Sequence, residues 1–219
     1  MINWVLVRVA ELRSSRGLTL MEIAIVVAIV AVLAATVMPI ALDKVNTARK
    51  VSARAEVKSI ATAIVTLYND TTEFPTRKGA DMDKIEVLRT GSDSTLDPNF
   101  VSEISALWEL SEADKLSNHL LVDNPGGVAD AYEDNNGAWR GPYIGEVGTD
   151  PWGRNYLVIA KGFYDSGTSE APIYAWVLSA GPNETIETDK DSETLNSDPT
   201  TGLTSNGDDI GYLMLSGGI

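Results

Sequence analysis

The 219-residue chain contains no cysteine, which excludes disulfide bonds, a cysteine-ligated zinc or iron–sulfur site and a thiol nucleophile. A single histidine, His119, leaves a Ser-His-Asp site or a multi-histidine metal site almost nothing to be built from. Basic residues are also few: 17 Lys and Arg stand against 31 Asp and Glu, and the net charge is -14. We therefore expect no enzymatic activity and no nucleic-acid partner, since nucleic-acid binding needs a basic face.

One long segment, residues 18–42, is almost wholly apolar, and Glu22 is its only charged residue. As a helix it would be about 38 Å long at ~1.5 Å per residue, more than the ~30 Å hydrocarbon core of a bilayer. A buried core helix is the alternative, but nothing else in the chain is apolar enough to surround it. A secretory signal peptide would have a shorter apolar stretch of about 7–15 residues. The sequence predicts a membrane-spanning helix.

The flanks of this helix differ in charge. Residues 1–17 carry three arginines against Glu11, a net charge of +2, while the remainder of the chain is strongly acidic. Basic flanks favour the cytoplasmic side, so we expect the remainder on the far side of the membrane. Within the helix, Glu22 costs ~2.5–3.5 kcal/mol on insertion scales and therefore suggests a functional site. Pro39 removes a backbone donor and is expected to loosen or kink the helix.

The sequence G-L-T-L-M-E at residues 17–22, with basic residues before it and an apolar run after it, resembles the class III signal of type IV pilins and type II secretion pseudopilins. The resemblance implies that a prepilin peptidase cuts between Gly17 and Leu18 and methylates the new N-terminus at Leu18. Leu18 departs mildly from the family, which more often has phenylalanine there. The apolar helix is retained and later packs in the centre of a filament.

The same resemblance gives Glu22 and Pro39 their expected roles. Glu22 becomes the fifth residue of the cut chain, where the family has a glutamate that pairs with the terminal amine of an adjacent subunit and sets the axial register. Pro39 becomes the twenty-second, again a position where the family often has proline. A buried amine–carboxylate pair suits that role, because removing one partner leaves a buried charge that costs ~3–5 kcal/mol. The alternative is an interfacial glutamate that reaches the headgroups.

The helix is predicted to continue beyond the membrane to about Tyr68, since residues 43–68 contain neither proline nor glycine. A stripe at helical spacing is expected to pack on a sheet: Val57, Ile60, Ala61, Ile64 and Leu67. Another face carries Lys50, Arg54 and Lys58, and residues 43–58 have a net charge of +3. That face is either solvated or in contact with headgroups or with the acidic domain of a neighbouring subunit.

Turn residues at 69–75 predict the end of the helix, and residues 77–140 are predicted to be loop-rich with one amphipathic helix at about 101–122. Its buried side would carry Leu107, Leu110, Leu116, Leu120 and Leu121, and His119 would be a half-buried structural residue. Short β-branched or aromatic segments bounded by glycine and proline predict strands at 155–160, 173–179 and 210–215.

A second resemblance narrows the family. The sequence D-P-W-G-R-N-Y at residues 150–156 is similar to a signature of the major, G-type pseudopilin of type II secretion, as is F-P-T at residues 74–76. Asp-Pro-Trp-Gly is expected to form a turn that places Trp152 on the core. Residues 77–140 are an insertion relative to that compact family.

Residues 178–184 and 207–210 look like the two halves of that family's calcium loop. The resemblance assigns side-chain ligands to Asp208 and Asp209, places Asn183 where the family has aspartate, and assigns the carbonyl of Leu178. Independently, residues 179–209 contain eight acidic residues against one lysine, and calcium prefers oxygen ligands. A solvated acidic loop is the alternative to calcium binding.

The sequence therefore predicts an α+β pilin fold: a long N-terminal helix packed on a small antiparallel sheet. Residues 1–17 would be a removed leader, 18–42 the transmembrane and filament-core half, and 43–219 a periplasmic domain with an acidic loop at 179–209. The resemblance implies a subunit of a type II secretion pseudopilus that waits in the bacterial inner membrane and drives export of folded proteins.

Its expected partners are further copies of itself, minor pseudopilins, the prepilin peptidase, the inner-membrane platform and ATPase, and lipid before assembly. Two alternatives remain: a type IV pilus subunit for adhesion, motility or DNA uptake, and a membrane-tethered binding domain that does not polymerise.

Overall fold

The computed structural model describes residues 18–78, 81–92, 94–100, 108, 110, 113–132, 139–146, 148–165, 174–188 and 207–215. The chain divides into two compact units, which meet between Lys44 and Val45 and are described separately below.

The main helix, α1 (Leu20–Thr71), has 52 residues and contains Pro39. All described residues up to Lys44 are exposed, whereas the stretch after Val45 has a buried stripe. That stripe contains Ala53, Val57, Ile60, Ala61, Ala63, Ile64, Leu67 and Thr71. All five residues predicted to face a sheet are in it. The predicted helix and its amphipathic second half are confirmed.

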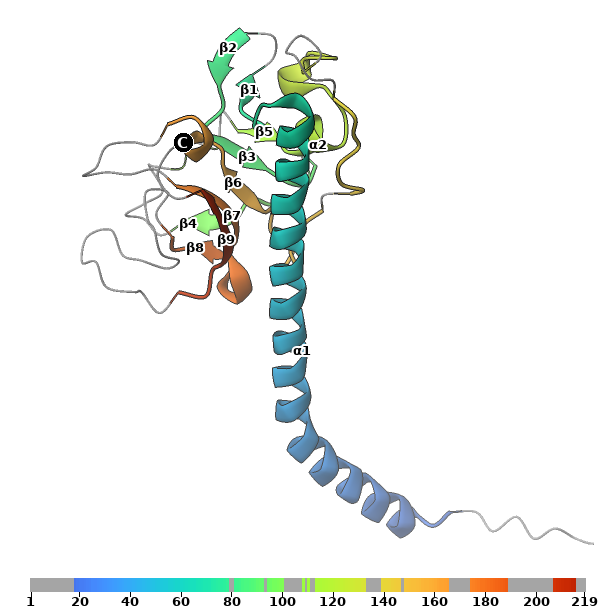
Figure 1. The fold of residues 1–219 in the computed structure, drawn as a ribbon. Helices are drawn as coiled ribbons and strands as arrows, with labels where there is room; N and C mark the ends of the chain where they lie inside the picture. Colours follow the sequence, from blue (N-terminus) through green and yellow to red (C-terminus); the bar gives the residue numbers. More distant parts are fainter. Residues whose placement is uncertain are drawn as a thin grey trace, which may run out of the picture. The chain divides into compact units, whose positions relative to one another are not determined.

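A five-stranded sheet lies beside this part of α1, with the strand order β5-β3-β6-β7-β9 (Figure 1). Its strands are β3 (Val87–Arg89), β5 (Asp114–Lys115), β6 (Leu157–Ile159), β7 (Ala175–Ser179) and β9 (Ile210–Leu215). Three neighbouring pairs are antiparallel, but β5 runs parallel to β3. The sheet is therefore mixed, and the expectation of a purely antiparallel sheet is wrong at this edge.

Both faces of the sheet are buried. Successive side chains along its central strands point to opposite faces, and each set packs in a different hydrophobic cluster. On one face, Val158 of β6 and Val177 of β7 pack with the buried stripe of α1. On the other face, their neighbours join a second cluster that includes Trp108 and Ile186. The members contributed by β6 and β7 are Leu157, Ile159, Trp176 and Leu178.

The remaining elements are short. Strands β1 (Arg77–Lys78) and β2 (Asp81–Lys84) form an antiparallel pair, and β4 (Asn99–Phe100) pairs in parallel with β8 (Thr185–Ile186). The short helices are α2 (Ser117–Leu120), η3 (Pro125–Gly127), η4 (Lys161–Phe163) and η5 (Gly181–Asn183).

The helix predicted at 101–122 is wrong where the structure describes it. Asp114 and Lys115 form strand β5, and only the four residues of α2 are α-helical. Pairing with β3 outweighs the local pattern, because leucine spacing fits a strand followed by one helical turn as well as a long helix. Leu116 and Leu120 are nevertheless fully buried, and Leu110 and Leu121 partly so. Leu107 lies outside the described residues.

The core contact between α1 and the sheet gives a prediction. Ile64 is fully buried and its neighbour Val65 is 46% exposed. We expect Ile64→Ala to lower the free energy of unfolding of residues 45–219 by about 2–5 kcal/mol and Val65→Ala by under ~1.5 kcal/mol. Urea unfolding followed by circular dichroism measures both. Equal losses at the two positions would contradict this packing.

Candidate functional site

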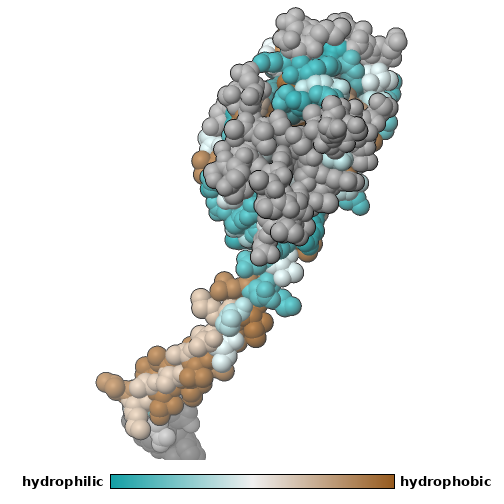
Figure 2. All heavy atoms as spheres, turned by 90° about the vertical axis from the view of Figure 1, so that its left-hand side faces the viewer, coloured by the Kyte–Doolittle hydropathy of each residue, from teal (hydrophilic) through white to brown (hydrophobic). Residues whose placement is uncertain are grey.

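The first half of α1 is an apolar surface that the described part of the chain leaves exposed. Every residue from Leu18 to Lys44 is exposed, and an 18-residue window of high mean hydropathy in α1 has no buried member. Figure 2 shows hydrophobic residues on the visible surface of this segment. Among the described residues, α1 is the one helix that is long and apolar enough to cross a membrane. Gly17, one side of the expected cleavage site, lies outside the described residues, and Leu18 on the other side is 74% exposed.

Glu22, the single charge in this surface, caps its own helix. Its Oε2 accepts hydrogen bonds from the backbone N–H and the hydroxyl of Thr19, both at 2.8 Å. In return, the Thr19 hydroxyl accepts a bond from the Glu22 N–H at 3.2 Å. This reciprocal arrangement is a capping box, which satisfies two backbone donors at the helix start.

Sequence reasoning missed this second role for Glu22, although T-L-M-E carries the signature, a threonine followed three residues later by a glutamate. The cap uses only Oε2. Within the described part of the chain, Oε1 accepts no hydrogen bond and forms no ion pair. One carboxylate oxygen therefore holds the helix start while the other stays open to a partner.

The Asp-Pro-Trp-Gly turn joins the sheet to the start of the acidic segment. Asp150 is 4% exposed, and its Oδ1 accepts bonds from the backbone N–H of Trp152 and of Arg154. Its Oδ2 accepts a 2.7 Å bond from the Ser179 hydroxyl at the end of β7. Burial raises the pKa of Asp150. Trp152 packs against the helix–sheet cluster, which confirms the role predicted for this turn.

Arg154, in the same turn, forms further contacts with Glu184 and Asp97. Its Nη2 donates to Glu184 Oε2 at 2.6 Å, and its Nη1 donates to the carbonyl of Asp97 at 3.1 Å. Glu184 has a φ of +60°, a left-handed conformation that is unusual for a residue other than glycine. The turn therefore fixes the backbone where the acidic segment leaves the sheet.

Three of the four expected calcium ligands lie together, around Glu187. Its Oε1 accepts from the Asn183 amide at 2.8 Å, and its Oε2 accepts from the Asp208 N–H at 3.0 Å. Its own N–H donates to Asp209 Oδ2 at 2.9 Å. The acidic composition of the segment was visible in the sequence, but this bridging position of Glu187 was not.

Asp208 and Asp209, the two expected carboxylate ligands, each have a buried Oδ1. Asp209 is 6% exposed and its Oδ2 also accepts two bonds from Thr188, yet burial raises its pKa to about 6. Asp208 Oδ1 is buried and has no hydrogen-bond partner among the described residues. Gly181, at a φ of +67°, fits closely against Asp208, since a Cβ there would lie 2.3 Å from its carbonyl oxygen.

Asn183 and Leu178, the remaining expected ligands, already take part in hydrogen bonds or strand pairing within the domain. Asn183 Oδ1 accepts the N–H of Thr185 at 2.8 Å, and Leu178 is fully buried within β7, paired with both neighbouring strands. Across the described ranges, no group of three histidine, aspartate or glutamate side chains is arranged to hold a metal ion.

His119 belongs to a buried chain of polar groups. It is fully buried rather than half-buried as expected, and its Nδ1 lies 2.5 Å from the Tyr132 hydroxyl. Its Nε2 lies 3.3 Å from Asp114 Oδ2, which also accepts the N–H of Gly126. The chain links β5, α2 and the segment after η3.

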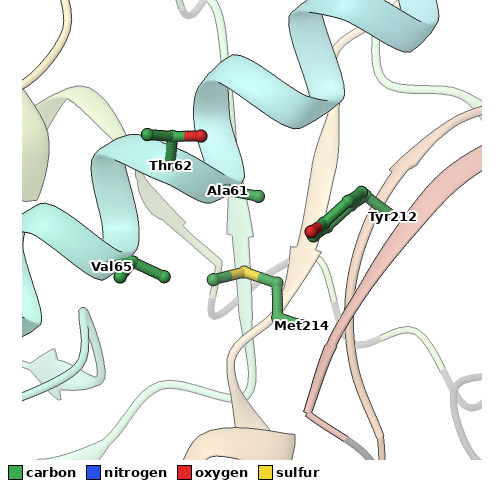
Figure 3. A pocket seen from close by; sticks show the side chains of 5 residues that line it. All are labelled: Ala61, Thr62, Val65, Tyr212 and Met214. Atoms are coloured by element: carbon green, nitrogen blue, oxygen red, sulfur yellow. The ribbon is translucent and has the colours of Figure 1, made fainter.

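A hollow of about 210 Å³ opens between α1 and the edge strand β9 (Figure 3). Val65 and Thr62 line it from the helix, and Tyr212 and Met214 from the strand. Tyr212 is 42% exposed, so the hollow is a shallow surface feature without a reactive group.

Comparison with protein-family models, with curated proteins and with solved structures finds no match to this chain.

The buried chain around His119 gives a prediction. Burial opposes ionisation of Asp114, but the close approach of His119 Nε2 and hydrogen bonds from the Gly126 and Lys115 N–H groups outweigh it and lower the pKa to about 2. A lowered carboxyl pKa stabilises the fold above the unfolded value, near 3.8, and that contribution is lost as the pH falls towards 2.

We expect about 1–2 kcal/mol of the free energy of unfolding to disappear over that range, allowing for solvent screening of the half-buried group. Asp114→Asn should flatten the dependence between pH 4 and pH 2, measured by urea unfolding. An unchanged slope in Asp114→Asn would show that another carboxyl is responsible.

Proposed function

We propose that this chain is a structural subunit of a type II secretion pseudopilus. Cleavage between Gly17 and Leu18 would leave α1 intact, with Leu18 as the methylated first residue. The observation that carries the proposal is the uncovered apolar half of α1, which continues directly into a helix packed on a sheet. This arrangement gives one polypeptide both a membrane or filament segment and a folded domain.

The energetics of the apolar half support two successive environments. Leu, Ile and Val side chains left in water cost about 1.5–3 kcal/mol each, so residues 18–42 need lipid or other helices around them. Helices of neighbouring copies are as apolar as lipid tails, and the exchange therefore involves little change in hydrophobic free energy. A filament can grow from the membrane by replacing lipid contacts with helix–helix contacts.

Glu22 would then provide the register between copies. Its Oε1 is available while Oε2 holds the cap, and an amine at Leu18 of a neighbouring copy would supply the positive charge. A charge pair that is desolvated together favours one axial position over all others, because any other position leaves a carboxylate buried without a partner. Pro39, inside α1, would give the helix local adaptability during packing.

The proposal includes the inner membrane of a bacterium as the starting location, with the domain in the periplasm. The prepilin peptidase, the assembly platform with its ATPase, and minor pseudopilins are the partners that such a filament requires. Neither catalysis nor nucleic-acid binding is part of the proposed function, in keeping with a net charge of -14 and a single histidine.

We also propose that a calcium ion binds beside Asp208 and Asp209 and joins the two ends of the acidic segment. The buried, unpartnered Oδ1 of Asp208 supports this, because a cation would supply its missing partner. The remaining ligands would include oxygens from Asn183, which adds no charge, and the expected carbonyl of Leu178. Such an ion would stabilise a domain that has no disulfide.

Two substitutions of Glu22 separate register from capping. Glu22→Gln keeps an acceptor for the Thr19 N–H but removes the charge, whereas Glu22→Ala removes both. We expect each variant to abolish filaments, scored by electron microscopy of sheared fibres, while the protein remains in the membrane fraction. Thr19→Ala, which loses only the hydroxyl contacts of the capping box, should cost about 0.5–2 kcal/mol of helix stability and still assemble.

Normal filaments in Glu22→Gln would contradict the register role and leave capping as the function of Glu22. Normal filaments in both Glu22 variants would show that assembly requires neither the charge nor the carboxylate of Glu22.

Calcium binding is measurable on residues 45–219 by isothermal titration and thermal unfolding. At calcium concentrations about 100-fold above Kd, we expect about 2.7 kcal/mol of added stability. Asp208→Asn should remove most of the heat, whereas Glu146→Gln, at an exposed acid outside the segment, should not. Neither heat nor a thermal shift in the unaltered domain would exclude the site.

A further inference from the structure

The second half of α1 carries a basic face, which we define as Arg49, Lys50, Arg54 and Lys58. It stands out because residues 45–219 as a whole carry 13 Lys and Arg against 28 Asp and Glu, a net charge of -15. Arg49, Arg54 and Lys58 are exposed and Lys50 is partly so. Nearly a third of the domain's cations are therefore concentrated on ten residues of one helix.

Within the part of the chain that the structure describes, no member of the basic face forms an ion pair. The other arginines of the domain do: Arg77 pairs with Glu73, Arg89 with Asp97, Arg140 with Asp70, and Arg154 with Glu184. In the described part of residues 45–219, every arginine outside the basic face is therefore paired with an acid of the same chain.

Keeping the basic face together has a cost. Lys50, Arg54 and Lys58 follow one another at four-residue spacing, where like charges on a helix repel by a few tenths of a kcal/mol per pair. Glu56, the one acid in the segment, does not relieve this repulsion. Its Oε1 accepts from Ser52 and its Oε2 from the buried Tyr156, so it is turned to the sheet. Such an arrangement is consistent with a basic face whose positive charge is neutralised by acidic groups of another molecule.

The position of the face distinguishes between possible partners. Ala53 and Val57, the residues immediately before Arg54 and Lys58, are buried in the cluster between α1 and the sheet. The two cations therefore lie alongside the folded domain. Charges act over about 8 Å at physiological ionic strength, so a partner has to reach the side of the domain itself. A second protein surface that lies along the domain meets this requirement.

We infer that the basic face docks against acidic side chains on the domain of a second copy of this chain. The inference rests on the proposed function, in which copies stand side by side in a filament. Domains with a net charge of -15 repel one another, and a basic face on each copy converts part of that repulsion into attraction. Because the basic face and the excess of acidic residues belong to the same chain, each copy can bind one neighbour through its basic face and a second neighbour through its acidic residues.

Zero-length crosslinking tests this contact on the full-length chain in its membrane. Cells expressing a mixture of isotopically heavy and light copies are treated with a carbodiimide, which joins a lysine amine directly to a carboxylate. We expect mixed-isotope peptides that join Lys50 or Lys58 to an aspartate or glutamate of another copy. The ion pair of Lys161 with Glu86, at 2.8 Å within one copy, provides the same-isotope control.

Charge reversal gives the second measurement. Arg54→Glu/Lys58→Glu should lower the yield of mixed-isotope crosslinks from Lys50 about ten-fold, and raising the salt concentration should lower it in the unaltered protein. The matched control, Lys84→Glu/Arg140→Glu, makes the same change of charge at cations outside the face and should leave the yield unchanged.

The outcomes separate this inference from the filament proposal. If copies crosslink through other lysines but never through Lys50 or Lys58, the filament proposal stands and the docking of the basic face is overturned. If no crosslinks between copies form at all, both are overturned. If the reversed variant instead loses binding to anionic lipid vesicles and keeps its crosslinks between copies, the face serves lipid and the inference is wrong.

Discussion

One continuous helix has to satisfy two environments, and the rest of the structure follows from that requirement. The first half of α1 is apolar around most of its circumference and stays exposed among the residues that the structure describes. The second half is apolar on one stripe only, and the sheet is built against that stripe. The boundary falls where Asp43 and Lys44 end the apolar run, so a short change in side-chain chemistry divides the helix without interrupting its backbone.

The chain has no cysteine, and buried polar groups hold the segments of the domain together. Asp150 ties the turn before β6 to the end of β7, and Arg154 holds Glu184 and the loop at Asp97. On the other side, His119 connects Asp114 to Tyr132. These contacts stabilise the ends of short strands that could not persist alone, and they fix the point where the acidic segment begins.

Patterns that reflect one element at a time could be read from the sequence. The apolar run, the stripe from Val57 to Leu67 and the strand at Ile210–Leu215 agree with the structure because burial on a helix or strand imposes a fixed period. The two-residue strand β5 could not be predicted, since its parallel pairing with β3 depends on residues far away in sequence. The position of Glu187 among Asn183, Asp208 and Asp209 likewise depends on two segments that meet only in the fold. The capping role of Glu22 could have been predicted from the sequence, because a threonine precedes the glutamate by three residues. The prediction made from its charge was instead a partner outside the chain.

The proposed role of this chain as a secretion filament subunit can be tested by deleting and then restoring its gene. The quantity measured is the location of the exported proteins in each strain. We expect folded exoproteins to accumulate in the periplasm of the deletion strain, and we expect the unaltered gene to restore their export. Normal export together with loss of surface fibres would contradict the secretion function and indicate a pilus subunit. Normal export with unchanged fibres would contradict both and leave a membrane-tethered domain.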